Sequence, residues 1–145
     1  MSPVATTDLE TATRVRLAVT RLSRRLRQES PPGPTPSMLS ALSSLVRRGP
    51  FSLRELAEVE RVQPPTMSRI VDSLIGAGFI ERIPDPTDGR SARLRATSAG
   101  RGLVRRRART TDAFLAERLR VLSDREIKIV EEAAVIFERL LEVDR

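Results

Sequence analysis

The chain has 145 residues, enough for one domain or for a small domain with dimerising helices, and too few for two full cores. It has no Cys, His, Trp or Tyr, which excludes a disulfide framework, a thiolate zinc site, a thiol redox sensor and a histidine base or metal ligand. With one lysine, Lys128, and no isolated carboxylate pair among apolar residues, the composition predicts no catalytic residue, metal or cofactor and indicates that the protein is not an enzyme.

The charge is concentrated in one part of the chain. Residues 82–109 contain nine arginines against Asp85 and Asp88, a net charge of +7 that equals the excess of the whole chain. A localised field of this kind attracts polyanions, nucleic acid first, although a solvated arginine-rich helix face is the alternative. No apolar run of about 18 residues and no secretory leader are present, so a cytoplasmic protein without a membrane span is expected.

The first predicted element is an amphipathic helix from Asp8 to about Gln28. Its apolar residues recur every three to four positions with arginines between them. The run Ser30-Pro31-Pro32-Gly33-Pro34 ends it, because no helix continues through such a segment. This run favours a stiff corner over an interdomain linker. Residues 1–34 are therefore predicted to be an N-terminal dimerisation helix and corner.

Three short helices follow. Thr35 is a predicted N-cap with Pro36 at the first helical position, and this helix ends at Arg47-Arg48-Gly49-Pro50. Ser52 and Glu55 form a capping box that opens a helix to about Glu60. A tight turn then leads to a helix that Pro64-Pro65 opens and that ends near Ala77. Two short helices joined this closely are typical of a helix-turn-helix.

A hairpin is predicted next. Residues 79–83 are typical of a strand, and in 91–96 apolar side chains alternate with Arg93 and Arg95. The segment between them, DPTDGR, has dense turn chemistry, and Gly89 is expected to let the loop turn through positive φ. A helix-turn-helix followed directly by a hairpin predicts a winged helix, so residues 35–97 are the expected DNA-binding lobe, with its wing at about 79–96.

Two further helices are predicted in residues 98–145, one from about Ser98 to Leu122 and one after a second capping box at Ser123 and Glu126. Their apolar stripes, with that of the N-terminal helix, are longer than a winged-helix core can cover. The simplest partner is a second copy of the chain, and packing within one chain is the alternative. The expected fold class is mainly α with a small β-hairpin: a winged helix-turn-helix with N- and C-terminal dimerisation helices.

The chain resembles the MarR family of bacterial winged-helix transcriptional regulators over essentially its whole length. The resemblance is densest in residues 53–100 and rests on Thr-x-x-Arg at 66–69, Gly-Phe-Ile-x-Arg at 78–82, Asp-Pro-x-Asp-x-Arg at 85–90 and Thr-x-x-Gly at 97–100. The chain departs from the usual pattern at Gln63, Pro65, Gly89 and Ala96, which affects the DNA sequence that is recognised and not the class.

The resemblance implies a homodimer on a pseudo-palindromic double-stranded operator. It also implies a repressor of its own and neighbouring genes that a small anionic or phenolic compound releases. The alternative is an architectural or interaction protein that uses the same fold without operator specificity or ligand response. The ratio of specific to non-specific affinity separates the two hypotheses.

The predicted DNA contacts lie in two segments. The first segment is the second helix of the helix-turn-helix, which is expected in the major groove. Gln63 suits adenine and Pro65 a thymine methyl, and the other predicted contacts to bases or phosphates are Thr66, Ser68 and Arg69. In the wing, Arg90 is expected in the minor groove with Asp88 as its orienting partner, and Arg93 and Arg95 either contact phosphate or serve solubility. Solvated surface residues are the alternative in each case.

The effector site is the least defined prediction. The absence of cysteine excludes oxidation sensing through a thiol, and the absence of Tyr, Trp and His leaves few polar anchors for a phenol. A pocket would have to use aliphatic residues of the second helix and an arginine for an anionic ligand. The predicted ligand-binding residues are Arg16, Met38, Leu42 and Phe51, and loss of ligand sensing is the alternative.

Overall fold

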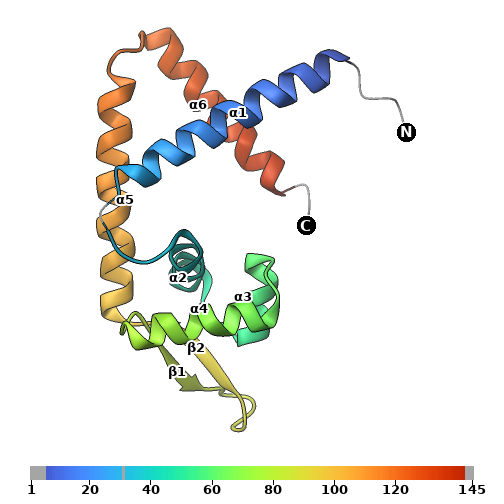
Figure 1. The fold of residues 1–145 in the computed structure, drawn as a ribbon, viewed down its shortest axis with the longest axis vertical. Helices are drawn as coiled ribbons and strands as arrows, with labels where there is room; N and C mark the ends of the chain where they lie inside the picture. The colour runs from blue at the N-terminus through green and yellow to red at the C-terminus, as the bar shows by residue number, and fades with distance from the viewer. Residues whose placement is uncertain (1–5, 31, 143–145) are drawn as a thin grey trace. The chain divides into compact units, whose positions relative to one another are not determined.

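The computed structural model describes residues 6–30 and 32–142, with side chains from residue 8 onward. The chain forms two compact units: Ser30–Arg109, the central unit, and an outer unit made of the chain on either side of it. The elements (Figure 1) are α1 Thr6–Gln28, α2 Pro36–Arg48, α3 Leu53–Glu60, α4 Pro64–Gly76, β1 Ile80–Pro84, β2 Ala92–Ala96, α5 Ser98–Leu119 and α6 Asp124–Glu142. This order confirms the predicted winged helix-turn-helix with flanking helices.

The helix starts are set by the caps that the sequence predicts. The Thr35 hydroxyl accepts from the backbone N–H of Met38, and Pro36 occupies the first helical position of α2. Both capping boxes form, the first at Ser52 and Glu55 of α3 and the second at Ser123 and Glu126 of α6. Each cap satisfies backbone N–H groups of its own first turn, so these boundaries need no tertiary contact to be defined.

The core of the central unit lies where α2, α3 and α4 pack against one another and against the hairpin. Its buried apolar residues are Ala41, Leu42, Leu45, Leu56, Ala57, Met67, Val71, Leu74, Ile80, Leu94 and Ala96. Ala57 is a small residue on α3, the first helix of the helix-turn-helix, and it lets α4 approach closely. The core therefore fixes α4 and the hairpin to one scaffold.

The hairpin is antiparallel, with Ile80 opposite Ala96 and Arg82 opposite Leu94. Phe51 adds a third-strand bridge, because its N–H donates to the Leu94 carbonyl (3.1 Å) and the Leu94 N–H donates back (2.6 Å). Several predicted boundaries differ from the structure by one to three residues, the start of α1 at Thr6 among them. The first strand begins at Ile80 because the Phe79 N–H donates to the Leu74 carbonyl at the end of α4 (3.0 Å). The second strand begins at Ala92, and α5 ends at Leu119, where the Leu122 N–H bonds back to the Leu119 carbonyl.

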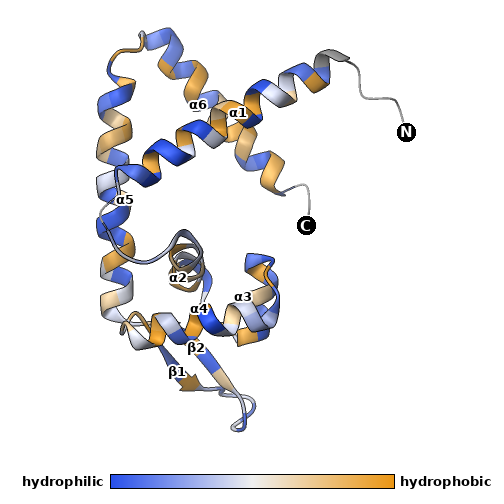
Figure 2. Cartoon of the chain, viewed as in Figure 1, coloured by the Kyte–Doolittle hydropathy of each residue, from blue (hydrophilic) through white to orange (hydrophobic). Residues whose placement is uncertain are grey.

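The outer unit is amphipathic, and its helices carry apolar side chains that remain in solvent. Figure 2 shows apolar and polar residues alternating along α1 and α6. The exposed large apolar residues of the described chain all belong to this unit: Leu9, Val15, Leu17, Val19, Leu22, Val121, Ile129, Val130, Val135, Ile136, Phe137, Leu140 and Leu141. Among the described residues, no helix is both long enough and apolar enough to span a membrane.

Candidate nucleic-acid interface

The turn between α3 and α4 is tight and closed by backbone hydrogen bonds. Arg61 caps α3 in the left-handed conformation with φ of 54°, and the Val62 N–H donates to the Ala57 carbonyl (3.0 Å). Pro64 and Pro65 then start α4 abruptly, without a side-chain cap from Gln63. The first turn of α4 is consequently left with backbone and side-chain groups facing solvent.

Helix α4 has one buried side and one exposed side. Met67, Val71 and Leu74 are buried in the core. Of the residues predicted to contact DNA, Gln63, Pro65, Thr66 and Arg69 are exposed and Ser68 is half-buried. The Arg69 guanidinium has no hydrogen-bond or ion-pair partner among the residues that the structure describes. The structure thus brings the five predicted residues together on the first two turns of one helix.

The wing loop is held by two aspartates that accept hydrogen bonds from the loop itself. Asp85 accepts from the N–H and the hydroxyl of Thr87, both at 2.8 Å. These two bonds lower the pKa of the Asp85 carboxyl below its ordinary value, and the bond from the Thr87 backbone N–H has the larger effect. Asp88 accepts from the Arg90 N–H (3.0 Å) and the Ser91 hydroxyl (2.9 Å). Side-chain hydrogen bonds to the backbone therefore define the loop.

One detail of the predicted loop is wrong. Gly89 does not have positive φ, since among the described glycines only Gly33 and Gly78 do. The turn is made instead by the Asp88 side chain and by the Ser91 N–H, which donates to the Asp88 carbonyl (3.0 Å). Asp88 contacts Arg90 at the backbone, where its carboxylate accepts from the Arg90 N–H, and the Arg90 guanidinium takes no part in this bond.

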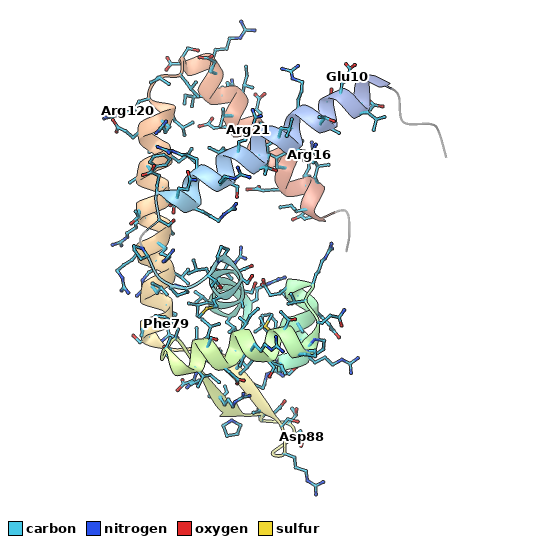
Figure 3. All side chains as sticks on the ribbon, viewed as in Figure 1. Glu10, Arg16, Arg21, Phe79, Asp88 and Arg120 are labelled. Atoms are coloured by element: carbon cyan, nitrogen blue, oxygen red, sulfur yellow. The ribbon has the colours of Figure 1, made fainter. Side chains whose placement is uncertain are left out.

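The guanidinium of Arg90 is left available at the wing. Arg90 is exposed, and its side chain has no hydrogen-bond or ion-pair partner in residues 8–30 and 32–142. Figure 3 places Asp88, two residues before it, at the tip of the hairpin loop. A free cation at the end of a projecting loop is suited to an anionic partner.

The other three arginines of the hairpin are engaged with carboxylates, and Arg82 forms an ion pair with Asp72 at 3.5 Å. Arg93 donates to Glu55 and to the Pro50 carbonyl, each at 2.9 Å, and forms an ion pair with Asp85 at 3.6 Å. Arg95 donates twice to Glu81 on the opposite strand, at 2.6 and 3.0 Å. Within the described residues, the structure thus separates the unpaired guanidinium of Arg90 from three paired ones.

The four predicted ligand-binding residues do not share one environment. Arg16 is exposed on α1 in the outer unit, whereas Met38, Leu42 and Phe51 belong to the central unit. Met38 and Phe51 are half-buried against the core, and Leu42 is fully buried. Leu42 is thus a core residue that no ligand can reach while the core is closed.

Sequence reasoning missed the contact that joins the end of the wing to α5. The Thr97 hydroxyl donates to the Gly78 carbonyl (2.7 Å) and accepts from the Gly100 N–H (3.1 Å). Thr97 therefore caps α5 and at the same time holds Gly78, two residues before β1. The Thr-x-x-Gly spacing was visible in the sequence as a helix start, but the bond to Gly78 depends on the folded hairpin.

Sequence reasoning also missed a cleft of mixed polar and apolar lining beside α4. A cavity of about 310 Å³ is lined by Pro36, Ser37, Ser40, Glu60, Val62, Met67 and Ile70. The Glu60 carboxylate accepts from the hydroxyls of Ser40 and Ser44, each at 2.5 Å. These bonds connect the end of α3 to α2, and no sequence pattern pairs residues so far apart.

A helix-turn-helix with an exposed α4, followed by a hairpin with a free arginine at its loop, defines a winged-helix DNA-binding protein. The MarR family profile matches residues 35–92. The chain is 41% identical over 128 residues to a helix-turn-helix-type transcriptional regulator of Mycobacterium tuberculosis, covering 88% of this chain and 90% of the relative. It is 38% identical to one of Mycobacterium leprae, covering 93% and 95%.

Solved structures agree with this assignment. A transcriptional regulator from Pseudomonas aeruginosa is 28% identical with a TM-score of 0.85, covering 94% of this chain and 97% of the other. A MarR family protein from Bacillus stearothermophilus shares the fold, at 23% identity and a TM-score of 0.81, covering 94% and 96%. The chain belongs to the MarR family and is a transcriptional regulator. Because the family consists of regulators, this also confirms that the protein is not an enzyme.

Proposed function

We propose that the protein is a dimeric, sequence-specific regulator that binds a pseudo-palindromic operator in the cytoplasm and represses its own and neighbouring genes. The observation that carries the proposal is the unpaired Arg90 guanidinium on the same compact unit as the exposed first turns of α4. Two elements fixed to one core can read two adjacent grooves of a duplex.

Helix α4 is the proposed major-groove element. Its first turn presents Gln63, Thr66 and Pro65, which suit adenine, a base or phosphate, and a thymine methyl, respectively. Arg69 lies one turn further on and can hold guanine bidentately or a phosphate, and Ser68 adds a hydroxyl beside it. The opposite side of α4 is buried in the core, so the helix can approach DNA only with this polar side.

The wing is the proposed minor-groove element. Arg90 is held at the backbone by Asp88 while its guanidinium stays free. A narrow A·T-rich groove concentrates negative potential and attracts an inserted guanidinium. Asp88 therefore serves DNA binding indirectly, by shaping the loop from which Arg90 extends.

The exposed apolar side chains of α1 and α6 support a homodimer. A second copy would cover them, and two lobes on half-sites about 34 Å apart would match a two-fold operator. We expect Leu140→Glu, at a residue 62% exposed on α6, to shift the protein from dimer to monomer, because the charge would be buried unpaired in the interface. Sedimentation velocity measures the shift, with Glu138→Gln as the control on the same helix. An unchanged dimer would place the interface elsewhere.

The test of operator binding is fluorescence anisotropy of the protein on the DNA upstream of its own gene and on a scrambled duplex, at physiological salt. We expect a preference of about 10³ or more for the upstream DNA. Arg90→Ala should weaken binding about 10- to 100-fold, because a groove-inserted guanidinium contributes roughly 1–3 kcal/mol. Arg54→Ala is the control, since Arg54 is an exposed arginine of α3 paired only with Glu58 among the described residues.

Equal binding to both duplexes would contradict local repression and would favour an architectural protein that uses the same fold. The net charge of +7 in residues 82–109 would then attract the DNA backbone without sequence specificity.

Release by a small anionic or phenolic compound belongs to the same proposal, with Met38, Phe51 and Arg16 as its candidate contacts. The same assay measures release as a fall in anisotropy when such a compound is added.

A further inference from the structure

We propose that Arg93 is a positioning residue that locks the wing to the helix-turn-helix, and that it does not contact DNA phosphate. This inference rests on the proposed function and assigns to Arg93 the task of aiming Arg90. Arg90 itself has no side-chain contact within the described residues that would fix its direction, so its aim depends on how the hairpin is held.

The guanidinium of Arg93 joins the wing loop to residues 50–55, which precede Arg93 by 38 to 43 positions. Its Nη2 atom donates to Glu55 Oε2 on α3 and to the carbonyl oxygen of Pro50, both at 2.9 Å. Its Nη1 atom lies 3.6 Å from Asp85 Oδ2, at the start of the wing loop. A planar fork of donors can bridge several oxygens at once, which a lysine ammonium cannot do with the same geometry.

The partners of Arg93 are themselves fixed. Glu55 Oε2 also accepts the Ser52 N–H (2.8 Å), so one carboxylate oxygen serves both the cap of α3 and the anchor of the wing. Asp85 is held by Thr87 and keeps only 13% of its side chain exposed, Arg93 keeps 24% and Glu55 keeps 46%. Charged hydrogen bonds that are partly shielded from water are stronger than exposed ones. The contact therefore joins the wing loop to α3 through two already ordered groups.

Arg95 provides a matched comparison on the same strand. Its bonds to Glu81 connect the two strands of the hairpin to each other, and the two side chains are 52% and 46% exposed. Substituting Arg95 or Glu81 removes one positive or one negative charge, as substituting Arg93 or Glu55 does. The bonds between the wing and α3 remain in place when Arg95 or Glu81 is substituted. The pair Arg95 and Glu81 is the control for the pair Arg93 and Glu55.

The direction in which one substitution changes DNA affinity distinguishes a positioning role of Arg93 from a contact with phosphate. Removing an acidic residue from a DNA-binding lobe ordinarily strengthens its attraction to DNA. If Arg93 aims the wing, Glu55→Gln should instead weaken operator binding, because a neutral amide loses the charge assistance of the bond from Arg93. Glutamine still fits a capping box, so the start of α3 is kept. Glu81→Gln, the control, should leave affinity unchanged or raise it.

The experiment measures operator affinity by anisotropy for the full-length protein and its variants. We expect Arg93→Gln and Glu55→Gln each to weaken binding about tenfold. The double variant should bind no more weakly than either single variant, because both substitutions act on the same contact. Arg90→Ala should cost little in the Arg93→Gln background, because its guanidinium is no longer aimed. Arg93→Lys should restore only part of the affinity.

Stronger or unchanged binding of Glu55→Gln would overturn the proposal, as would full rescue by Arg93→Lys or additive effects of Arg90→Ala and Arg93→Gln. Amide hydrogen exchange in the absence of DNA supplies a second, independent measurement. The N–H groups of Thr87, Arg90 and Ser91 should exchange faster in Arg93→Gln and Glu55→Gln than in Arg95→Gln. Equal exchange in all three would also overturn it.

The two measurements separate failure of this inference from failure of the proposed function. If the wild-type protein shows no preference for the upstream DNA, operator binding fails while hydrogen exchange still decides whether Arg93 anchors the wing. If the preference for the upstream DNA is present and the exchange rates are equal, the protein is an operator-binding regulator and Arg93 does not anchor the wing. Thermal unfolding of each variant confirms that the core is intact.

Discussion

Replacing Gly100 by alanine is expected to lower the free energy of unfolding by about 2–3 kcal/mol, because the new methyl group has no space. A Cβ at this position would overlap the carbonyl oxygen of Phe79 and lie 3.1 Å from Leu42 Cδ1. The Phe79 carbonyl cannot move freely, since it accepts the Thr97 N–H (3.0 Å). Alanine is ordinarily more favourable than glycine in a helix interior by about 1 kcal/mol. The cost of the steric overlap must exceed any gain of this kind.

Gly102→Ala is the matched control in the same helix. Its Cβ would approach only the guanidinium end of Arg106, at 3.0 Å, and such a flexible group moves at little cost. We expect this variant to be as stable as the wild type or slightly more stable. Urea unfolding followed by circular dichroism measures both changes. Equal stability of the two variants would contradict the close packing of α5 against the residue that precedes β1.

Leu42→Ala is expected to destabilise the protein by about 3 kcal/mol, since deleting a buried leucine leaves a cavity in the core. Leu42 is fully buried on α2 and lies beside the position of Gly100. Met38→Ala, at a half-buried residue of the same helix, should cost less. Urea unfolding measures both.

This prediction also separates two roles for Leu42. A ligand-lining residue would change effector response with little effect on stability, whereas a core residue changes stability first. A small loss for Leu42→Ala, equal to that of Met38→Ala, would contradict its place at the centre of the core.

Local sequence was sufficient for the elements whose determinants lie within a few residues of each other. The Thr35 cap, the box at Ser52 and Glu55, and the proline start of α4 all form as expected. Their hydrogen bonds connect residues three positions apart or depend on the φ of proline alone. The order helix, turn, helix and hairpin was readable for the same reason, and with it the winged-helix class.

The wing shows where local reasoning reached its limit. The loop was predictable from its aspartates and glycine, but the φ assigned to Gly89 was wrong because the Asp88 side chain supplies the turn. Asp and Gly can both produce a turn, and only the folded loop decides which one does so. The predicted DNA and ligand contacts stay predictions.

Tertiary structure decided which arginines are paired with carboxylates. The sequence places Arg90 in the loop and Arg93 and Arg95 on the strand after it, all within six residues, but it does not show their partners. The fold brings Glu55, 38 positions away, to Arg93 and aligns Glu81 with Arg95, while Arg90 keeps a free guanidinium. The sequence by itself determined the class, the helix caps and the concentration of charge, because these follow from composition and short-range bonds. Which charge is neutralised and which stays available depends on distances between remote segments, and only packing of the core sets them.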